Sequence, residues 1–416
     1  MEFDWSPEIQ AFRKEVREFI KTVLPADWIG TGEDADWEFQ QFARKKLAEQ
    51  KWLVMHWPVE YGGLGYSHWH MVTYAEEMTY ARYPGVYGIA TNTAGPSIMI
   101  YGTEEQKRTL LPAIANADLY FCQMFTEPGA GSDLASLQTR AVREGDDYVV
   151  NGQKVFTGGA HHADKAWLAV RTDQDAPKHR GISTFVLDMK TPGITIRPLI
   201  GMAGEHSGNE IFLDNVRVPV TDLVGTENRG WYQMTTTLDF ERSSITRWYG
   251  VKRTFDDIVT FVKEAGANGS TLAKQPRVRT KLADIHVQIE VARYIAYRII
   301  SMQNQGLIPN RETSVAKVFG PELVQRCFNA GMQILGLYGQ IKPNGKYAQL
   351  RGQIEHGYLS SIAGTIAGGS SEINRNIIAN RGWDCRGNGH LSPMDNDRLR
   401  GHGAGNARAT PLTRGW

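Results

Sequence analysis

The strongest constraint on the fold of this chain is that the period of its apolar residues changes twice. Up to about residue 120 they recur at helical spacing, from about 121 to 232 they form short strand-like runs, and from about 233 the helical spacing returns. Helices and strands present their apolar faces at periods of 3.6 and two residues, so these regions need separate layers. The sequence therefore predicts an α+β protein with the order helical, β, helical.

Start signals and apolar stripes support the two helical regions. Ser6 before Pro7 predicts a capped helix start, and Thr103 to Gln106 reads as a capping box. Two later stripes indicate long bundle helices. The first stripe comprises Leu282, Ile285, Ile289, Ala292, Ala296 and Ile299, and the second comprises Phe319, Leu323, Cys327, Ala330 and Ile334.

The middle region is predicted to be a small β-barrel or β-sandwich. YVVNGQKVF reads as two short strands joined by a tight turn at Asn151–Gly152, and four further strand-like runs follow it. The predicted domains are an N-terminal helical domain (1–120), a central β domain (121–232), a C-terminal four-helix bundle (233–384) and a polar, glycine-rich tail (385–416).

Charge and cysteine content exclude several classes of function. The 46 Lys and Arg residues nearly balance the 45 Asp and Glu residues, which leaves no basic field for nucleic acid. The three cysteines form no CxxC pair, which argues against structural zinc and a secreted disulfide framework. No apolar run reaches membrane-spanning length and no signal peptide is evident, so a cytoplasmic protein is expected.

A run of small residues lies near the C-terminal end, in TIAGGSSEI (365–373). It indicates that another group, such as a ligand, comes close to the backbone here. Ala367, Gly368 and Gly369 permit sharp turns, and Ser370 or Ser371 can cap a following helix whose free N–H groups would face a ligand. A tight turn between helices, packed against its own core, is the equally acceptable alternative.

A second loop, FCQMFTEPGAGSDLASL (121–137), carries the clearest resemblance. TEPGAGSD resembles a signature of the acyl-CoA dehydrogenase family, and four more family motifs follow in order over residues 1–382. They are NGQKVFTGG (151–159), FLDNVRVP (212–219), QILGLYG (333–339) and TIAGGSSEINR (365–375). Helical, β and helical domains are also the architecture of that family.

The resemblance implies FAD as the cofactor and an acyl-CoA thioester as the substrate. It implies that bound FAD touches Phe125, Thr126, Gly131, Ser132, Phe156, Thr157, Gln333 and Gly336, the last two at its adenine end, usually across a subunit interface. Ser132 and the Gly368 amide would also meet the thioester. The product would be a trans-2-enoyl-CoA, with an electron-transfer flavoprotein as electron acceptor. A dimer or tetramer is expected, possibly with a different second subunit.

The base that removes the α-proton is the difficult assignment. Many relatives carry a glutamate at the position of Gly368, and glycine cannot act as a base. Glu241 lies on an apolar stripe with Met234 and Trp248, where burial would raise its pKa toward neutrality, and it matches the base position of the isovaleryl and long-chain branches. The alternative is a surface glutamate paired with a neighbouring arginine. Asp239 and Arg242 match positions that contact coenzyme A, or else form an exposed ion pair.

Three departures from the family pattern concern the flavin. Gly158 replaces a hydroxyl residue, Leu337 replaces a glycine, and the Arg-x-x-Phe-Gly start of a bundle helix is missing. These departures keep two alternatives open: a non-catalytic partner subunit of a heteromeric enzyme, and an oxygen-reactive relative such as an acyl-CoA oxidase or a flavin monooxygenase. In these departures the chain resembles a bacterial branch of the family that acts on bulky acyl groups.

Two other groups of polar residues have simpler interpretations. His161, His162 and Asp164 lack a further ligand pattern, so no metal site is predicted. Glu372 follows the small-residue run and could be mistaken for the missing base, but an acid in the first turn of a helix is favoured by the helix dipole.

Overall fold

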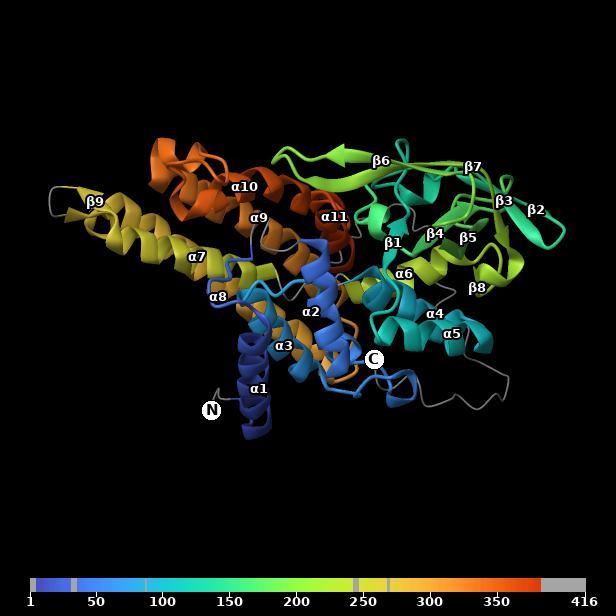
Figure 1. Ribbon diagram of the computed structural model, residues 1–416, viewed down its shortest axis with the longest axis horizontal. Helices are drawn as coiled ribbons and strands as arrows, with labels where there is room; N and C mark the ends of the chain where they lie inside the picture. The colour runs from blue at the N-terminus through green and yellow to red at the C-terminus, as the bar shows by residue number, and fades with distance from the viewer. Residues whose placement is uncertain (1–4, 31–35, 87, 242–246, 268–269, 383–416) are drawn as a thin grey trace.

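The computed structural model describes residues 5–30, 36–86, 88–241, 247–267 and 270–382. The first and last regions are helical and the middle region is a sheet, as predicted; Figure 1 shows the strands of the middle region gathered at one end of the molecule. The longer helices are α1 (Pro7–Val23), α2 (Trp37–Glu49), α3 (His68–Tyr80), α4 (Gly95–Tyr101), α5 (Glu104–Ala115), α6 (Gly230–Glu241), α7 (Arg247–Glu264), α8 (Pro276–Asn304), α9 (Asn310–Leu335), α10 (Gln353–Ser360) and α11 (Ser371–Gly382).

The main sheet is mixed, with the strand order β6-β7-β3-β2-β4-β5-β8 and β1 pairing in parallel with β4. Its strands are β1 (Phe121–Met124), β2 (Arg140–Glu144), β3 (Asp147–Lys154), β4 (Lys165–Arg171), β5 (Ile182–Asp188), β6 (Ile194–Ile200), β7 (His206–Pro219) and β8 (Leu223–Val224). A two-stranded sheet of β9 (Gly266–Ala267) and β10 (Ser270–Thr271) follows α7.

The predicted turn at Asn151–Gly152 is wrong. β3 runs straight through both residues and pairs with β7, with a shift of register between Val150 and Gly152. The glycine is needed for close approach, because a Cβ at Gly152 would stand 2.5 Å from the hydroxyl oxygen of Thr139. The turn lies earlier, between β2 and β3, where Gly145 has a positive φ of 64°.

The predicted helix starts and stripes are confirmed. Ser6 accepts a hydrogen bond from the Ile9 amide, and the capping box of Thr103 and Gln106 is complete. Apart from Ile299, which is buried elsewhere, the predicted bundle stripes lie in one apolar core of α7, α8 and α9. A separate core joins the N-terminal helices to the sheet and includes Met234 of α6, so α6 is anchored where the two domains meet.

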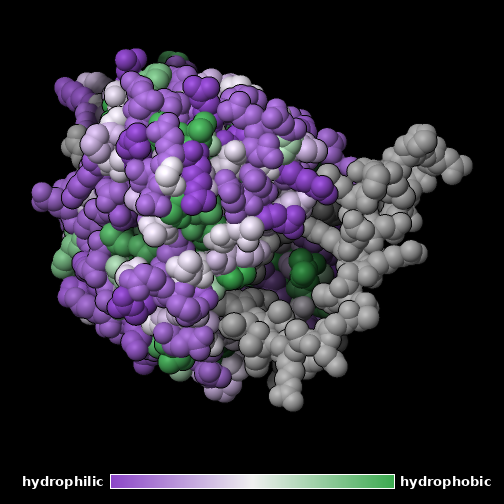
Figure 2. Space-filling model, turned by 90° about the vertical axis from the view of Figure 1, so that its right-hand side faces the viewer, coloured by the Kyte–Doolittle hydropathy of each residue, from purple (hydrophilic) through white to green (hydrophobic). Residues whose placement is uncertain are grey.

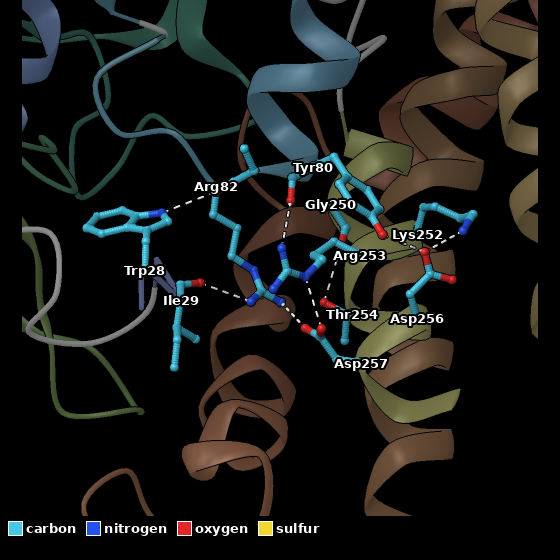
Figure 3. A network of polar contacts seen from close by, with 11 residues as sticks. Trp28, Ile29, Tyr80, Arg82, Gly250, Lys252, Arg253, Thr254, Asp256 and Asp257 are labelled. Atoms are coloured by element: carbon cyan, nitrogen blue, oxygen red, sulfur yellow. Dashed lines mark hydrogen bonds and ion pairs between the residues drawn. The ribbon is translucent and has the colours of Figure 1, made fainter. Parts of the chain in front are cut away.

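A polar network fastens α3 to α7 (Figure 3). Arg82, just after α3, donates to Asp257 at 2.9 Å and to the Ile29 carbonyl at 3.1 Å, and Arg253 donates to the same carboxylate at 2.9 Å. The Tyr80 hydroxyl donates to Asp256 at 2.9 Å. These partly buried contacts hold the N-terminal domain against the bundle.

The surface agrees with the balanced composition. Seen from the sheet side, it is mainly hydrophilic with small groups of apolar residues (Figure 2). Within the described ranges no helix combines the length and apolar character needed to span a bilayer. Cys122 and Cys327 are buried free thiols, and Cys385 lies outside the described residues, as does the predicted tail.

A buried ion pair connects the two motif segments of the sheet domain. The Lys154 ammonium, with no exposed surface, donates to Glu127 at 2.7 Å and to the Phe125 carbonyl at 3.1 Å. Glu127 also accepts from the amides of Gln138 (2.5 Å) and Thr139 (2.9 Å). Burial lowers the pKa of Lys154, and Glu127 opposes that fall. Burial also opposes ionisation of Glu127, but Lys154 and the two donors hold the pKa of Glu127 below its ordinary value.

Replacing Lys154 by methionine should destabilise the protein strongly. The change leaves the Glu127 carboxylate buried without its cation, which costs about 3–5 kcal/mol of unfolding free energy. Chemical denaturation at neutral pH measures this loss. Arg217→Met is the matched control, because it breaks an exposed ion pair with Glu144 in the same sheet and should cost below about 1 kcal/mol. Equal losses in the two variants would contradict the role assigned to the buried pair.

Candidate active site

A strained turn directly after β3 presents an aromatic ring. Phe156 has a positive φ of 57°, and 76% of its surface is exposed. The residues on both sides are fixed: the Val155 amide donates to the Thr126 carbonyl at 2.9 Å, and the Thr157 amide donates to the Asn209 carbonyl at 3.0 Å. A non-glycine residue persists in this conformation when its surroundings determine it, and such strain concentrates at functional sites.

The loop after β1 lies beside this turn, because Thr126 contacts Val155. Gly131 and Ser132 are exposed, and nothing lies within 4 Å of the place where a Cβ on Gly131 would stand. Phe125 is different, with only 3% of its surface exposed and its ring packed in the core between the helices and the sheet. A ligand could therefore reach the backbone of Phe125 more readily than its ring.

These two segments fit the isoalloxazine of FAD, the cofactor that the resemblance implies. The exposed ring of Phe156 offers an apolar face to a flat group. Thr157 is buried, and its hydroxyl has no hydrogen-bond partner among the described residues, so a ligand edge could supply one. Gly131 leaves open space next to the loop.

The loop of small residues lies between the short helix η11 (Ser361–Thr365) and α11. Gly368 and Gly369 have positive φ values of 67° and 86°, and Ile366, Ala367 and Gly368 are exposed. The loop is therefore not packed against its own core, as the helix-turn alternative required. Ser370 is the helix cap, because its hydroxyl accepts from the Ile373 amide at 3.3 Å.

A buried lysine on α9, which was not predicted from the sequence, contacts the segment that leads into this loop. The Lys317 ammonium on α9 donates to the Gly364 carbonyl at 2.8 Å, and its Cε lies 3.6 Å from where a Cβ on Gly368 would stand. Glu372 is exposed at the start of α11; hydrogen bonds from its own amide and from Ser370 hold its pKa below the ordinary value. That supports its interpretation as an ionised acid of the first helical turn rather than a base.

Glu241 is the last residue of α6, two helical turns after the buried Met234 and on the same face of the backbone helix. The side chains of Asp239 and Glu241, and the whole of Arg242, lie outside the described residues. The predicted roles of these three residues therefore remain predictions.

The predicted adenine-binding residues lie at the far end of α9. Gln333 is exposed in its last turns, and Gly336 begins η9 (Gly336–Gln340) with a positive φ of 59°. Leu337 next to them is 81% exposed. Both residues are therefore open to contact with another molecule, and their predicted role at the adenine end of FAD remains a prediction.

Three histidines cluster beside the Phe156 turn. His161 stacks on His206 with ring centroids 3.9 Å apart, and His162 stacks on Trp37 of α2 at 4.1 Å. The Asp164 carboxylate accepts a hydrogen bond from the Tyr120 amide at 2.9 Å. Over the described ranges no cluster of His, Cys, Asp and Glu is arranged to hold a metal ion.

An apolar cavity of about 590 Å³ lies between α3, α7 and α9. Its wall includes Val86, Val251, Val324, Cys327 and Phe328, and it also includes Arg82 of the network in Figure 3. Val324 is seven residues, or about 10 Å along α9, from Lys317 beneath the small-residue loop. The sequence did not predict this cavity.

Sequence motifs could have indicated one of the features that were missed. Glu127 and Lys154 each lie within a quoted motif, so their pairing was open to inference. The roles of Asn209 and His206 could not be inferred from motifs. These residues reach the Phe156 turn only through the folded sheet, which brings together residues about 50 positions apart.

Family comparisons match nearly the whole chain in three consecutive parts. The N-terminal domain of acyl-CoA dehydrogenase matches residues 6–118, the middle domain matches residues 122–216, and the C-terminal domain matches residues 228–382.

Individual relatives are similar over the same span. Acyl-CoA dehydrogenase FadE26 of Mycobacterium tuberculosis is 36% identical over 91% of this chain and 97% of its own length. Among solved structures, the Tcur3481-Tcur3483 steroid ACAD is 35% identical with a TM-score of 0.85, covering 92% of this chain and 99% of that one. The ChsE4-ChsE5 complex from Mycobacterium tuberculosis is 35% identical with a TM-score of 0.81, covering 91% and 98%.

Proposed function

The chain belongs to the acyl-CoA dehydrogenase family and is an acyl-CoA dehydrogenase, and we propose that Glu241 is the base that removes the α-proton of its thioester substrate. The family is FAD-dependent. The observation that carries the assignment is a pair of positions: glycine at 368, which cannot act as a base, and a glutamate at 241, at the end of α6 and two helical turns after the buried Met234.

Each segment of the site has a separate task in the α,β-dehydrogenation. The Gly368 amide donates to the thioester oxygen and stabilises the negative charge that develops there, while Glu241 takes the α-proton. Phe156 and Thr157, together with Thr126, Gly131 and Ser132, are the residues that would hold the flavin part of the cofactor. Bound FAD supplies, at N5, the acceptor for the hydride that leaves the β-carbon. The product is a trans-2-enoyl-CoA.

A second subunit is part of the proposed enzyme. Gln333 and Gly336 are exposed at the end of α9, where they would meet the adenine end of FAD held by another chain. The similar ChsE4-ChsE5 structure is a complex of two differently named proteins, which supports a heteromeric assembly. Asp239 and Arg242 are proposed to bind the coenzyme A part of the substrate, and an electron-transfer flavoprotein is proposed as the electron acceptor.

The acyl group is proposed to be bulky. The small residues Ala367, Gly368 and Gly369 leave room near the thioester, and the wall of the apolar cavity between α3, α7 and α9 includes Val324, about 10 Å along α9 from Lys317. A cavity of about 590 Å³ is large enough for the apolar end of a polycyclic or branched acyl chain. The related structure described as a steroid ACAD supports this class of substrate.

Changing Glu241 to glutamine should abolish reduction of the flavin by acyl-CoA. Loss of a positioned base slows proton transfer by a factor of about 10²–10⁴. Anaerobic stopped-flow bleaching of the visible flavin absorbance, in the assembled holoenzyme, measures the rate. Glu372→Gln is the matched control and should bleach at the wild-type rate. An undiminished rate in Glu241→Gln would refute the assignment, and turnover with dioxygen alone would favour an oxidase.

A larger side chain at position 250 should lower activity toward bulky acyl groups more than toward short ones. A Cβ at Gly250 would meet the Thr79 Cγ2 at an ordinary 3.6 Å, so Gly250→Ala should be tolerated, whereas Gly250→Leu occupies the cavity. We expect Gly250→Leu to lower kcat/KM for steroid-side-chain thioesters roughly ten-fold or more and to leave butyryl-CoA unchanged. Equal losses for both substrates would contradict the assignment of this cavity to the acyl chain.

A further inference from the structure

Asn209 forms hydrogen bonds with the turn that contains Phe156 and Thr157. It lies in β7 with no exposed surface, and its carbonyl accepts from the Thr157 amide at 3.0 Å. Its side-chain nitrogen donates to the Thr157 carbonyl at 2.9 Å. One residue therefore holds both backbone groups of Thr157, directly next to the strained φ of Phe156.

Two histidines determine how the Asn209 amide is turned. The side-chain oxygen of Asn209 accepts from His206 Nε2 at 2.8 Å, and its nitrogen donates to His161 Nδ1 at 3.2 Å. Since an amide nitrogen can only donate, His161 Nδ1 must be unprotonated for this contact to exist. The rings of His161 and His206 also stack at 3.9 Å, an arrangement that disfavours charge on both.

The groups around His161 come from several parts of the chain. His162 lies 4.1 Å away on η6 (Ala160–His162) and stacks in turn on Trp37 of α2. Beyond Trp37, Tyr120 packs edge-on at 4.8 Å, with the guanidinium of Arg44 over its ring. Asp164 accepts from the Tyr120 amide. The histidine cluster thus connects α2 to the turn.

From these contacts we propose that Asn209, oriented by His161 and His206, is a positioning residue for the flavin-facing turn, and that it holds the turn only while His161 is neutral. The inference rests on the proposed function, since it takes the Phe156 turn as a wall of the FAD site. Protonation of His161 at Nδ1 removes one acceptor of the Asn209 amide and places charge within the stack. FAD binding should therefore weaken as the pH falls below the usual histidine range.

The electrostatics of the cluster agree with the geometry. Burial, followed by the neighbouring His162 and His206, lowers the pKa of His161 below its ordinary 6.5. Burial and His206 lower the pKa of His162 in the same direction. With the folded-state pKa depressed, the unfolded chain binds more protons between the two values. The stability contributed by the neutral cluster is therefore present above pH 6.5 and is lost as the pH falls through that window.

Two conservative variants test the positioning role, with the FAD dissociation constant of the assembled enzyme measured by flavin fluorescence between pH 5.5 and 8. Asn209→Asp keeps the shape of the side chain but removes the donor to Thr157, and it should weaken FAD binding about ten-fold at pH 7.5. His161→Gln offers an oxygen acceptor that does not titrate. It should bind FAD like the wild type at pH 7.5 and lose less affinity than the wild type at pH 5.5.

A control and two contrary outcomes separate this inference from the proposed function. His286→Gln changes a histidine on α8 that stacks on Phe255, and it should keep the wild-type pH profile. If Asn209→Asp and His161→Gln both follow the wild type at every pH while the wild type binds FAD, the positioning inference is wrong and the proposed function stands. If the wild-type assembly binds no FAD at any pH, both are wrong.

Discussion

The buried ion pair between Lys154 and Glu127 is the contact on which the geometry of the site depends. An ammonium without exposed surface is stable only when its charge and its hydrogen bonds are satisfied, and here the Glu127 carboxylate and the Phe125 carbonyl satisfy them. The pair holds the end of β3 against the loop after β1. The turn at Phe156 and the loop at Gly131 are therefore in register before any ligand binds.

The remaining parts of the site come from regions far apart in the chain. Glu241 ends a helix anchored in the core between the helices and the sheet, and Gly368 lies in a loop that Lys317 supports from the bundle. None of these segments could present its groups alone, because each depends on packing supplied by another domain. Contacts such as Arg82 with Asp257, which fasten α3 to α7, keep those domains in fixed relation.

Much of the fold was predictable from local signals. The changes of hydrophobic period predicted the three regions, and the caps at Ser6 and Thr103 predicted two helix starts, because a capping interaction involves residues only three positions apart. The turn at Asn151–Gly152 was predicted wrongly. Its residues favour a turn in isolation, but here they lie within β3, which pairs with β7. The missing side chain at Gly152 leaves space for the close approach of Thr139.

By itself the sequence determined the order of the domains, the two loops of small residues and the glycine at 368, since residue type and spacing carry that information. Only the tertiary structure decided that Asn209 grips Thr157, that Phe125 packs its ring into a core, and that a cavity lies between α3, α7 and α9. The physical reason is that such contacts join residues tens to hundreds of positions apart, and their distances depend on how whole helices and strands pack together.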